Sequence, residues 1–136
     1  MHKRDYLVKQ FEEFGKVIAV LLGLKRDGNF PEYLNLINES VKKYTQTELE
    51  FVESIDDDQL ITILTAEKKL NDEQLKMLAD LMYEKAEYYL NQSQELEATH
   101  CYKKAYSIYL FLKENATLTY SLDMHYKIEV LSKMGL

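Results

Sequence analysis

Three groups of residues in this sequence carry side chains that could take part in chemistry. His100 and Cys101 are adjacent, an acidic run occupies residues 56–58, and Glu84 and Glu87 are three residues apart. Side chains of these types can bind a metal ion, supply a thiolate nucleophile or exchange protons as a pair of carboxyl groups. Each of these activities also requires that the side chains have a particular spacing along the chain.

The spacing in this chain supports none of the three activities. Neighbouring residues of a helix point about 100° apart, so His100 and Cys101 cannot chelate one ion or act as base and nucleophile together. The chain has no second cysteine, and its other two histidines are distant in sequence. The acidic run suits the first turn of a helix, where the helix dipole favours negative charge. No apolar surroundings that would raise a carboxyl pKa are evident around Glu84 and Glu87. We therefore expect no metal, no cofactor and no enzymatic activity.

The composition is that of one globular domain spanning residues 1–136. Hydrophobic residues make up 46% and charged residues 29% of the chain, and one proline and four glycines leave long helices uninterrupted. The single cysteine cannot form an internal disulfide, which suits a reducing compartment. The longest apolar run, VIAVLLGL, is shorter than the roughly twenty residues of a membrane span. Because no secretory signal is visible either, we expect a cytoplasmic protein that does not enter a membrane.

The net charge of −6 is unevenly distributed along the chain. Residues 45–100 contain fourteen Asp and Glu against four Lys, whereas residues 1–26 contain six Lys and Arg against three acids. Nucleic acids are bound by basic residues that release counterions from the phosphates. The acidic middle of the chain therefore argues against nucleic acid as a partner.

Apolar periodicity predicts helices throughout the chain and no strand. Helices are expected over about residues 3–25, from Pro31 to Tyr44, around residues 60–64, from Asn71 to residue 90, over residues 95–114 and over residues 119–133. Asn71 with Gln74, and Asp56 with Gln59, have the spacing of a capping box. The long helix after Asn71 is expected to bury the stripe Leu75, Leu78, Ala79, Met82, Ala86, Tyr89 and Leu90.

The first predicted helix is apolar on more than one side. Its main stripe consists of Leu7, Phe11, Phe14, Ile18, Leu21 and Leu22, and further apolar residues lie beside it. Gly15, Ala19 and Gly23 are four residues apart and would let another backbone approach closely. Two alternatives are open: the other helices cover this surface within one chain, or it meets the same surface of a second chain in a two-fold homodimer.

Residues 79–112 resemble one tetratricopeptide repeat, a helix-turn-helix unit of about thirty-four residues. The small and aromatic residues that the family places along its two helices are matched by Met82, Ala86, Tyr89, Ala98, Tyr102 and Ala105. The chain departs from the family at Lys85, Ser93 and Leu110. The whole chain also resembles an uncharacterised family of small bacterial proteins, for which no activity is known. The resemblance implies an all-α fold, a right-handed tetratricopeptide-like superhelix or bundle of about five to six antiparallel helices.

In tetratricopeptide repeats the first helix supplies the ligand groove. By resemblance, the partner-binding positions of this chain are Asp80, Tyr83, Glu84, Glu87, Leu90 and Asn91. This set is acidic with apolar spots, so it favours a basic peptide or a basic face of another protein. We therefore expect a non-catalytic adaptor or scaffold.

Two other functions remain open. The chain contains eleven tyrosines and no tryptophan. We expect most of the tyrosines in the core, but they could instead line an aromatic pocket between helices. A small-molecule sensor or an enzyme subunit is then the alternative. A purely structural homo-oligomer is the third reading.

Overall fold

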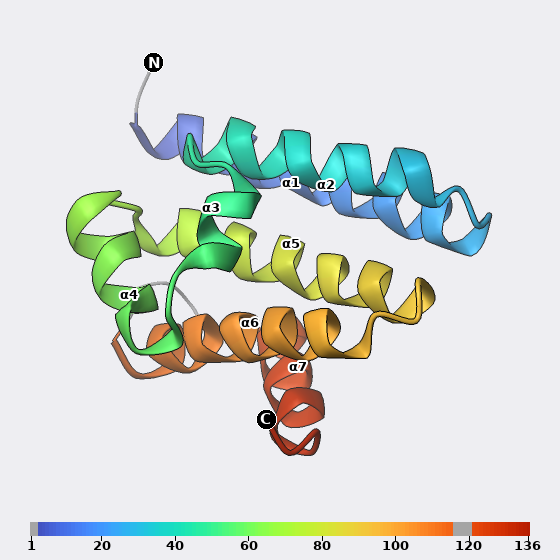
Figure 1. Ribbon diagram of the computed structural model, residues 1–136. Coiled ribbons are helices and arrows are strands. Elements are labelled where there is room, and N and C mark those ends of the chain that lie inside the picture. Colours follow the sequence, from blue (N-terminus) through green and yellow to red (C-terminus); the bar gives the residue numbers. More distant parts are fainter. Residues whose placement is uncertain (1–2, 116–120) are drawn as a thin grey trace.

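The computed structural model describes residues 3–115 and 121–136, with the side chains of residues 3, 4 and 7 left aside. Within these residues the protein is helical and contains no strand (Figure 1). The elements are α1 (Lys3–Arg26), α2 (Phe30–Thr45), α3 (Leu49–Ser54), η1 (Asp57–Gln59), α4 (Leu60–Thr62), η2 (Ile63–Glu67), α5 (Asp72–Asn91), α6 (Glu95–Asn115) and α7 (Leu122–Ser132). The predicted all-α helical bundle is confirmed, whereas the right-handed superhelix stays a prediction.

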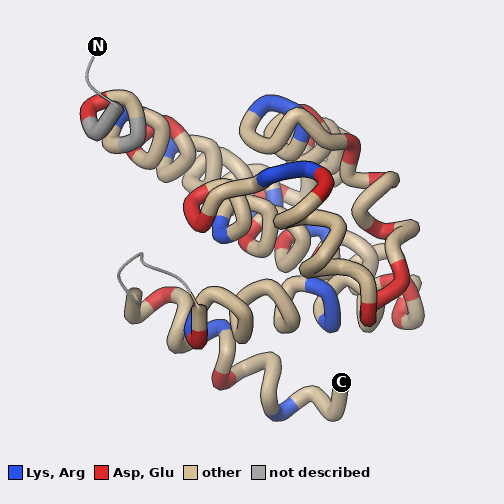
Figure 2. The backbone as a smooth tube through the Cα atoms, turned by 90° about the vertical axis from the view of Figure 1, so that its left-hand side faces the viewer, with Lys and Arg blue, Asp and Glu red and all other residues tan. Residues whose placement is uncertain are grey.

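Two antiparallel helix pairs, α1–α2 and α5–α6, form the body of the protein (Figure 1). Helix α5 packs between α2 and α6, and α7 packs on α6. In the view of Figure 2, α1 lies on the upper side of the molecule and α7 on the lower side. The short elements from α3 to η2 connect the two pairs, and α4 packs on α6. The buried apolar residues of all these helices form one cluster.

Side-chain caps start the helices where the sequence predicts them. The Asn29 side chain accepts a hydrogen bond from the backbone nitrogen of Glu32, and Pro31 occupies the first turn of α2. The capping box of Asn71 and Gln74 is confirmed, with hydrogen bonds of 2.8 and 3.0 Å. These caps satisfy backbone donors that a helix start otherwise leaves unpaired, and therefore define where α2 and α5 begin.

The second predicted capping box is wrong. Asp56 precedes η1 with extended backbone angles, but its side chain makes no capping hydrogen bond. The next residue, Asp57, accepts a hydrogen bond of 2.7 Å from Lys104 of α6 instead. Asp57 therefore pairs with a lysine of another helix and does more than complement a helix dipole.

The interface between α5 and α6 holds most of the core that the sequence predicted. Five of the seven residues of the predicted α5 stripe are buried: Leu75, Leu78, Ala79, Met82 and Ala86. Tyr89 is half-buried. The prediction that Leu90 belongs to the core is wrong, because 45% of its surface is exposed. On α6 the matching small and aromatic residues Ala98, Tyr102 and Ala105 are all buried. The small residues Ala86, Ala98 and Ala105 therefore leave room for close packing of α5 on α6.

The turn between α5 and α6 places a non-glycine residue in the left-handed region. Ser93 has a φ of 60°, and Gln94 donates a backbone hydrogen bond of 2.9 Å to the carbonyl of Tyr89. This is the closing pattern of a helix C-terminus, for which glycine is the usual residue because it lacks a Cβ. Ser93 therefore takes a conformation that glycine adopts more easily.

Helix α1 is only partly covered by the rest of the chain. Phe14 and Leu21 are buried, whereas Phe11, Val20 and Leu22 are between 42% and 54% exposed. The side chain of Leu7 and the predicted helix start at Thr119 lie outside the described residues. Within the described ranges, no helix is both long and apolar enough to cross a lipid bilayer.

Enlarging Ala86, which is fully buried, should destabilise the fold. Ala86→Leu adds three carbons to a packed interface and is expected to lower the free energy of unfolding by about 1–3 kcal/mol, as overpacking typically does. Urea denaturation measures the change. Ala66→Leu, at an exposed position, is the control and should change stability by less than about 0.5 kcal/mol. Equal stability of the two variants would contradict close packing at Ala86.

Candidate functional site

The six residues predicted to bind a partner differ widely in exposure. Asp80 and Glu84 are buried, with 3% and 4% of their surface exposed. Tyr83 and Glu87 are half-buried, and Leu90 and Asn91 are exposed. All six lie on α5. The structure therefore does not bring them together as one open acidic surface, and their role in binding stays a prediction.

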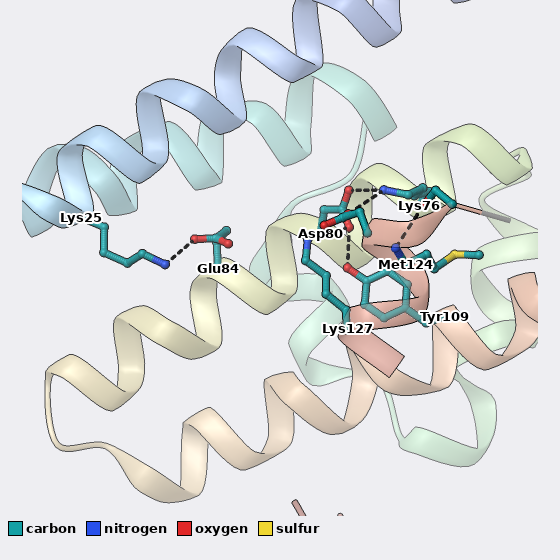
Figure 3. A network of polar contacts seen from close by, with 9 residues as sticks. Lys25, Lys76, Asp80, Glu84, Tyr109, Met124 and Lys127 are labelled. Atoms are coloured by element: carbon teal, nitrogen blue, oxygen red, sulfur yellow. Dashed lines mark hydrogen bonds and ion pairs between the residues drawn. The ribbon is translucent and has the colours of Figure 1, made fainter. Parts of the chain in front are cut away.

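Asp80 is the centre of a polar cluster between three helices (Figure 3). Its carboxylate accepts hydrogen bonds from Lys76 Nζ at 2.7 Å, from Lys127 Nζ at 3.3 Å and from the hydroxyl of Tyr109. These donors come from α5, α7 and α6, respectively. Because burying an unpaired carboxylate is costly, the three donors are what allows Asp80 to lie in the interior.

Asp123, near the start of α7, completes the cluster. Its Oδ2 lies 3.6 Å from Lys76 Nζ and 3.5 Å from Lys127 Nζ. Burial lowers the pKa of Lys127, but the carboxylates of Asp80 and Asp123 outweigh burial and raise this pKa. The lysine therefore stays charged at neutral pH. With two lysines and two aspartates, the cluster is electrically neutral.

Glu84 has a similar arrangement one helical turn further along α5. Lys25 Nζ of α1 lies 3.2 Å from Glu84 Oε1 (Figure 3), and the hydroxyl of Tyr33 of α2 donates to the same oxygen at 2.5 Å. Burial, followed by the charge of Glu84, raises the pKa of Tyr33, so its hydroxyl stays protonated and donates. Lys25 also lies 3.6 Å from Glu87 Oε1, and Tyr102 donates to Glu87 at 2.7 Å.

Beside the Asp80 cluster the surface has an open hollow of about 490 Å³, here called the α5 hollow. Its walls come from α1, from the first half of α5 and from the start of α7. The lining residues are Phe11, Phe14, Glu73, Lys76, Met77, Asp80, Ser121 and Asp123. Phe11 is 42% exposed, whereas Phe14 and Met77 are buried behind it. The hollow thus combines an apolar wall with a charged floor and rim.

The candidate residues for covalent or metal chemistry are not assembled into a site. Cys101 is buried, and burial, followed by the charge of Glu53, raises the pKa of its thiol to about 12. The neighbouring His100 is exposed. In the described part of the chain, no three His, Cys, Asp or Glu side chains are grouped so that they could hold a metal ion. The α5 hollow, which adjoins the buried Asp80 cluster, is the candidate functional site that remains to be considered.

The residues predicted for self-association lie along the outer side of α1. Gly15 and Ala19 are exposed, and Gly23 is half-buried. A Cβ added at Gly15 would meet no atom within 4 Å, so nothing inside the chain requires a glycine there.

Comparison of the chain with protein-family models, with curated proteins and with solved structures gives no match. The tetratricopeptide and bacterial-family resemblances therefore remain predictions.

Sequence reasoning missed the lysines that cover the predicted acidic face. Two of these ion pairs, Lys76 with Asp80 and Asp123 with Lys127, have the i, i+4 spacing of helical neighbours and were visible in the sequence. The pairing of Lys25 with Glu84 joins residues 59 positions apart, and no local pattern indicates it.

Removing the Tyr109 hydroxyl should destabilise the protein. Tyr109→Phe leaves the buried Asp80 carboxylate with one donor fewer, and hydrogen bonds to charged groups contribute about 1.5–3 kcal/mol. Urea denaturation should show a loss of this size. Tyr106→Phe, three residues earlier on α6, is the control, because within the described residues the Tyr106 side chain makes no hydrogen bond. A loss in the control equal to that of Tyr109→Phe would mean that the Asp80 contact is not responsible.

The protein should also lose stability as the pH rises from about 9 to 12. Burial raises the pKa of Cys101 from 9.0 and that of Tyr44 from 10.0, each to about 12. In this range the unfolded chain has released these protons while the folded chain still holds them, so rising pH favours unfolding. Urea midpoints measured across the range should fall. Cys101→Ala should make the fall shallower, and a midpoint that stays constant up to pH 11 would contradict the raised pKa values.

Proposed function

We propose that this protein is a non-catalytic protein-interaction module, an adaptor or scaffold, and that the α5 hollow receives an apolar side chain of a basic segment of its partner. The observation that supports this proposal is the combination of an apolar wall with the exposed carboxylate of Asp123 and the half-buried carboxylate of Glu73. An anchor residue in a pocket, surrounded by charged contacts, is the usual composition of a protein interface.

The charge that the α5 hollow presents to solvent is negative. Lys76, which lines the hollow, and Lys127 of the neighbouring cluster are largely buried: 17% and 13% of their side chains are exposed, and both already bind Asp80. By contrast, 56% of the Asp123 side chain is exposed, and Glu73, which also lines the hollow, is half-buried. A basic partner is therefore favoured over an acidic or phosphorylated one.

This proposal changes the roles of the six positions implied by the tetratricopeptide resemblance. Asp80 and Glu84 have a structural role in this proposal, since their oxygens already accept hydrogen bonds from lysines and tyrosines of the same chain. The half-buried Tyr83 and Glu87 and the exposed Leu90 and Asn91 are available to the rest of a bound segment. A cytoplasmic location is part of the same proposal.

A small ligand is the second candidate. A volume of about 490 Å³ falls within the roughly 300–1,000 Å³ of small-molecule sites, and Phe11 and Phe14 supply the aromatic surface that such a site requires. The carboxylates of Asp123 and Glu73 favour a cationic molecule. Because the hollow is open rather than closed, it fits a side chain of a longer partner better than an enclosed ligand.

Binding of a synthetic peptide tests the proposed function. The probe is a twenty-residue amphipathic helix that carries one tryptophan and leucines at 3–4 spacing, with lysines elsewhere. Since the protein contains no tryptophan, the peptide alone reports binding through a blue shift of its emission. We expect the lysine peptide to bind, more weakly at high salt, and the same peptide with glutamates in place of lysines not to bind.

Two matched substitutions locate the binding surface. Phe11→Ala should weaken binding about tenfold, which corresponds to roughly 1.4 kcal/mol of lost apolar contact. Phe51→Ala on α3 is the control, since Phe51 is 40% exposed and Phe11 is 42% exposed. Glu73→Lys should weaken binding of the lysine peptide further. Equal affinity for both peptides, or an undiminished affinity of the Phe11→Ala protein, would refute the proposal.

A further inference from the structure

We propose that a second hollow, between α1 and α2, binds a small organic anion in which one carboxylate is joined to an aromatic ring. This hollow, here called the α1–α2 hollow, has a volume of about 360 Å³ and shares no lining residue with the α5 hollow. The inference therefore concerns a separate site, whose ligand is opposite in charge to the partner proposed above. The lining residues are Tyr6, Lys9, Gln10, Glu13, Lys43 and Tyr44.

The first half of α1 and the last turn of α2 form the walls of this hollow. Tyr6, Gln10 and Glu13 are separated by four and three residues, so they lie along one side of α1. Because α2 runs antiparallel to α1, its last turn lies beside them. The ammonium group of Lys43 donates a hydrogen bond to Glu13 Oε1, and the hydroxyl of Tyr44 donates to the same oxygen at 3.2 Å. These contacts join the two walls.

The α1–α2 hollow carries one excess positive charge in a protein whose net charge is −6. Lys9 and Lys43 supply two cations, and Glu13 supplies one anion. The hydrogen bond from Lys43 holds the pKa of Glu13 below its usual value, so this carboxylate stays ionised at neutral pH. One excess positive charge matches a carboxylate ligand. A phosphate monoester is matched less well, because it carries about 1.5 to 2 negative charges at neutral pH and would face Glu13 with the surplus.

Three hydrogen-bond donors of the hollow are available to a ligand. Within the described residues, the ammonium group of Lys9, the amide of Gln10 and the hydroxyl of Tyr6 make no hydrogen bond, whereas Lys43 and Tyr44 are engaged by Glu13. Lys9 acts on Glu13 only through its charge. A carboxylate has two oxygens that accept hydrogen bonds and none that donates. Its chemistry is therefore complementary to these three donors.

Tyr6 supplies the aromatic surface of the hollow. Its side chain is 55% exposed, whereas Tyr44 is buried and packs edge-on against Phe14 with 5.4 Å between the ring centroids. Aromatic rings pack favourably on one another in offset or edge-to-face arrangements, so a ring in the ligand would cover the exposed ring of Tyr6. A volume of about 360 Å³ lies near the lower end of the roughly 300–1,000 Å³ of small-molecule sites, which suits a ligand of one or two rings.

NMR titration of the nitrogen-15-labelled full chain with naphthalene-2-carboxylate tests the proposal. We expect saturable shifts of the backbone amides of residues 6–13 and 43–44 and of the side-chain amide of Gln10, with a Kd of about 1 mM, which is ordinary for so small a ligand. Naphthalene-2-carboxamide has the same shape without the charge and should bind about fivefold more weakly, as the loss of charge-assisted contacts predicts. The dianionic 2-naphthyl phosphate should also bind more weakly than the carboxylate.

Matched substitutions locate the bound carboxylate. Lys9→Gln and Lys43→Gln should each weaken binding about threefold, since an exposed ion pair contributes little. Lys16→Gln on α1 and Lys42→Gln on α2 are the controls: they remove the same charge from exposed positions that do not line the hollow, and should leave the affinity nearly unchanged. Tyr6→Ala should weaken binding about threefold by removing the ring contact. All five positions are exposed, and circular dichroism checks that each variant keeps its helicity.

Several outcomes would overturn the inference: no saturable shift at these residues, equal affinity for the carboxylate and the carboxamide, tighter binding of 2-naphthyl phosphate, or equal losses in the lysine variants and their controls. Shifts confined to the α5 hollow would overturn it as well. The lysine-peptide experiment is independent, because Lys9→Gln and Lys43→Gln should still bind that peptide. A protein that binds naphthalene-2-carboxylate but not the peptide supports the α1–α2 hollow and refutes only the proposed function of the α5 hollow.

Discussion

The buried carboxylate of Asp80 is the constraint on which the arrangement of the helices depends. A carboxylate with only 3% of its surface exposed has to exchange its hydration for donors within the protein. Lys76, Tyr109 and Lys127 supply these donors from α5, α6 and α7. Any displacement of α7 relative to the α5–α6 pair would leave the charge partly unpaired. The polar contacts therefore add a directional constraint to the apolar packing of α7, whose Met124, Ile128 and Leu131 are buried.

Glu84 has the equivalent role on the other side of α5. Lying one turn after Asp80, it accepts hydrogen bonds from Lys25 of α1 and Tyr33 of α2. The two carboxylates therefore tie α5 to both neighbouring parts of the bundle. On a third side, Lys85 of α5 donates to Glu53 of α3 at 2.8 Å. This pairing gives a physical reason for the lysine that stands where the tetratricopeptide pattern has leucine.

Because these internal charges are paired, they are not available to a partner. The surfaces left for association are those where apolar groups stay uncovered or carboxylates stay exposed. One is the α5 hollow, which is lined by the exposed Phe11 and the exposed Asp123.

The sequence by itself determined the helices, several of their starting points and most of the core. Local signals suffice for these features, since a capping box such as Asn71 with Gln74 and the apolar stripe of α5 depend on residues close together in the chain. Only the tertiary structure decided that Asp80 and Glu84 are buried, that Leu90 is exposed and that the outer face of α1 stays uncovered. These outcomes depend on side chains such as Lys25, Tyr33 and Tyr109, which lie between 29 and 59 residues from the carboxylates they bind. Helical periodicity gives the direction in which a side chain points, but the helix that it meets there is fixed only when the chain has folded.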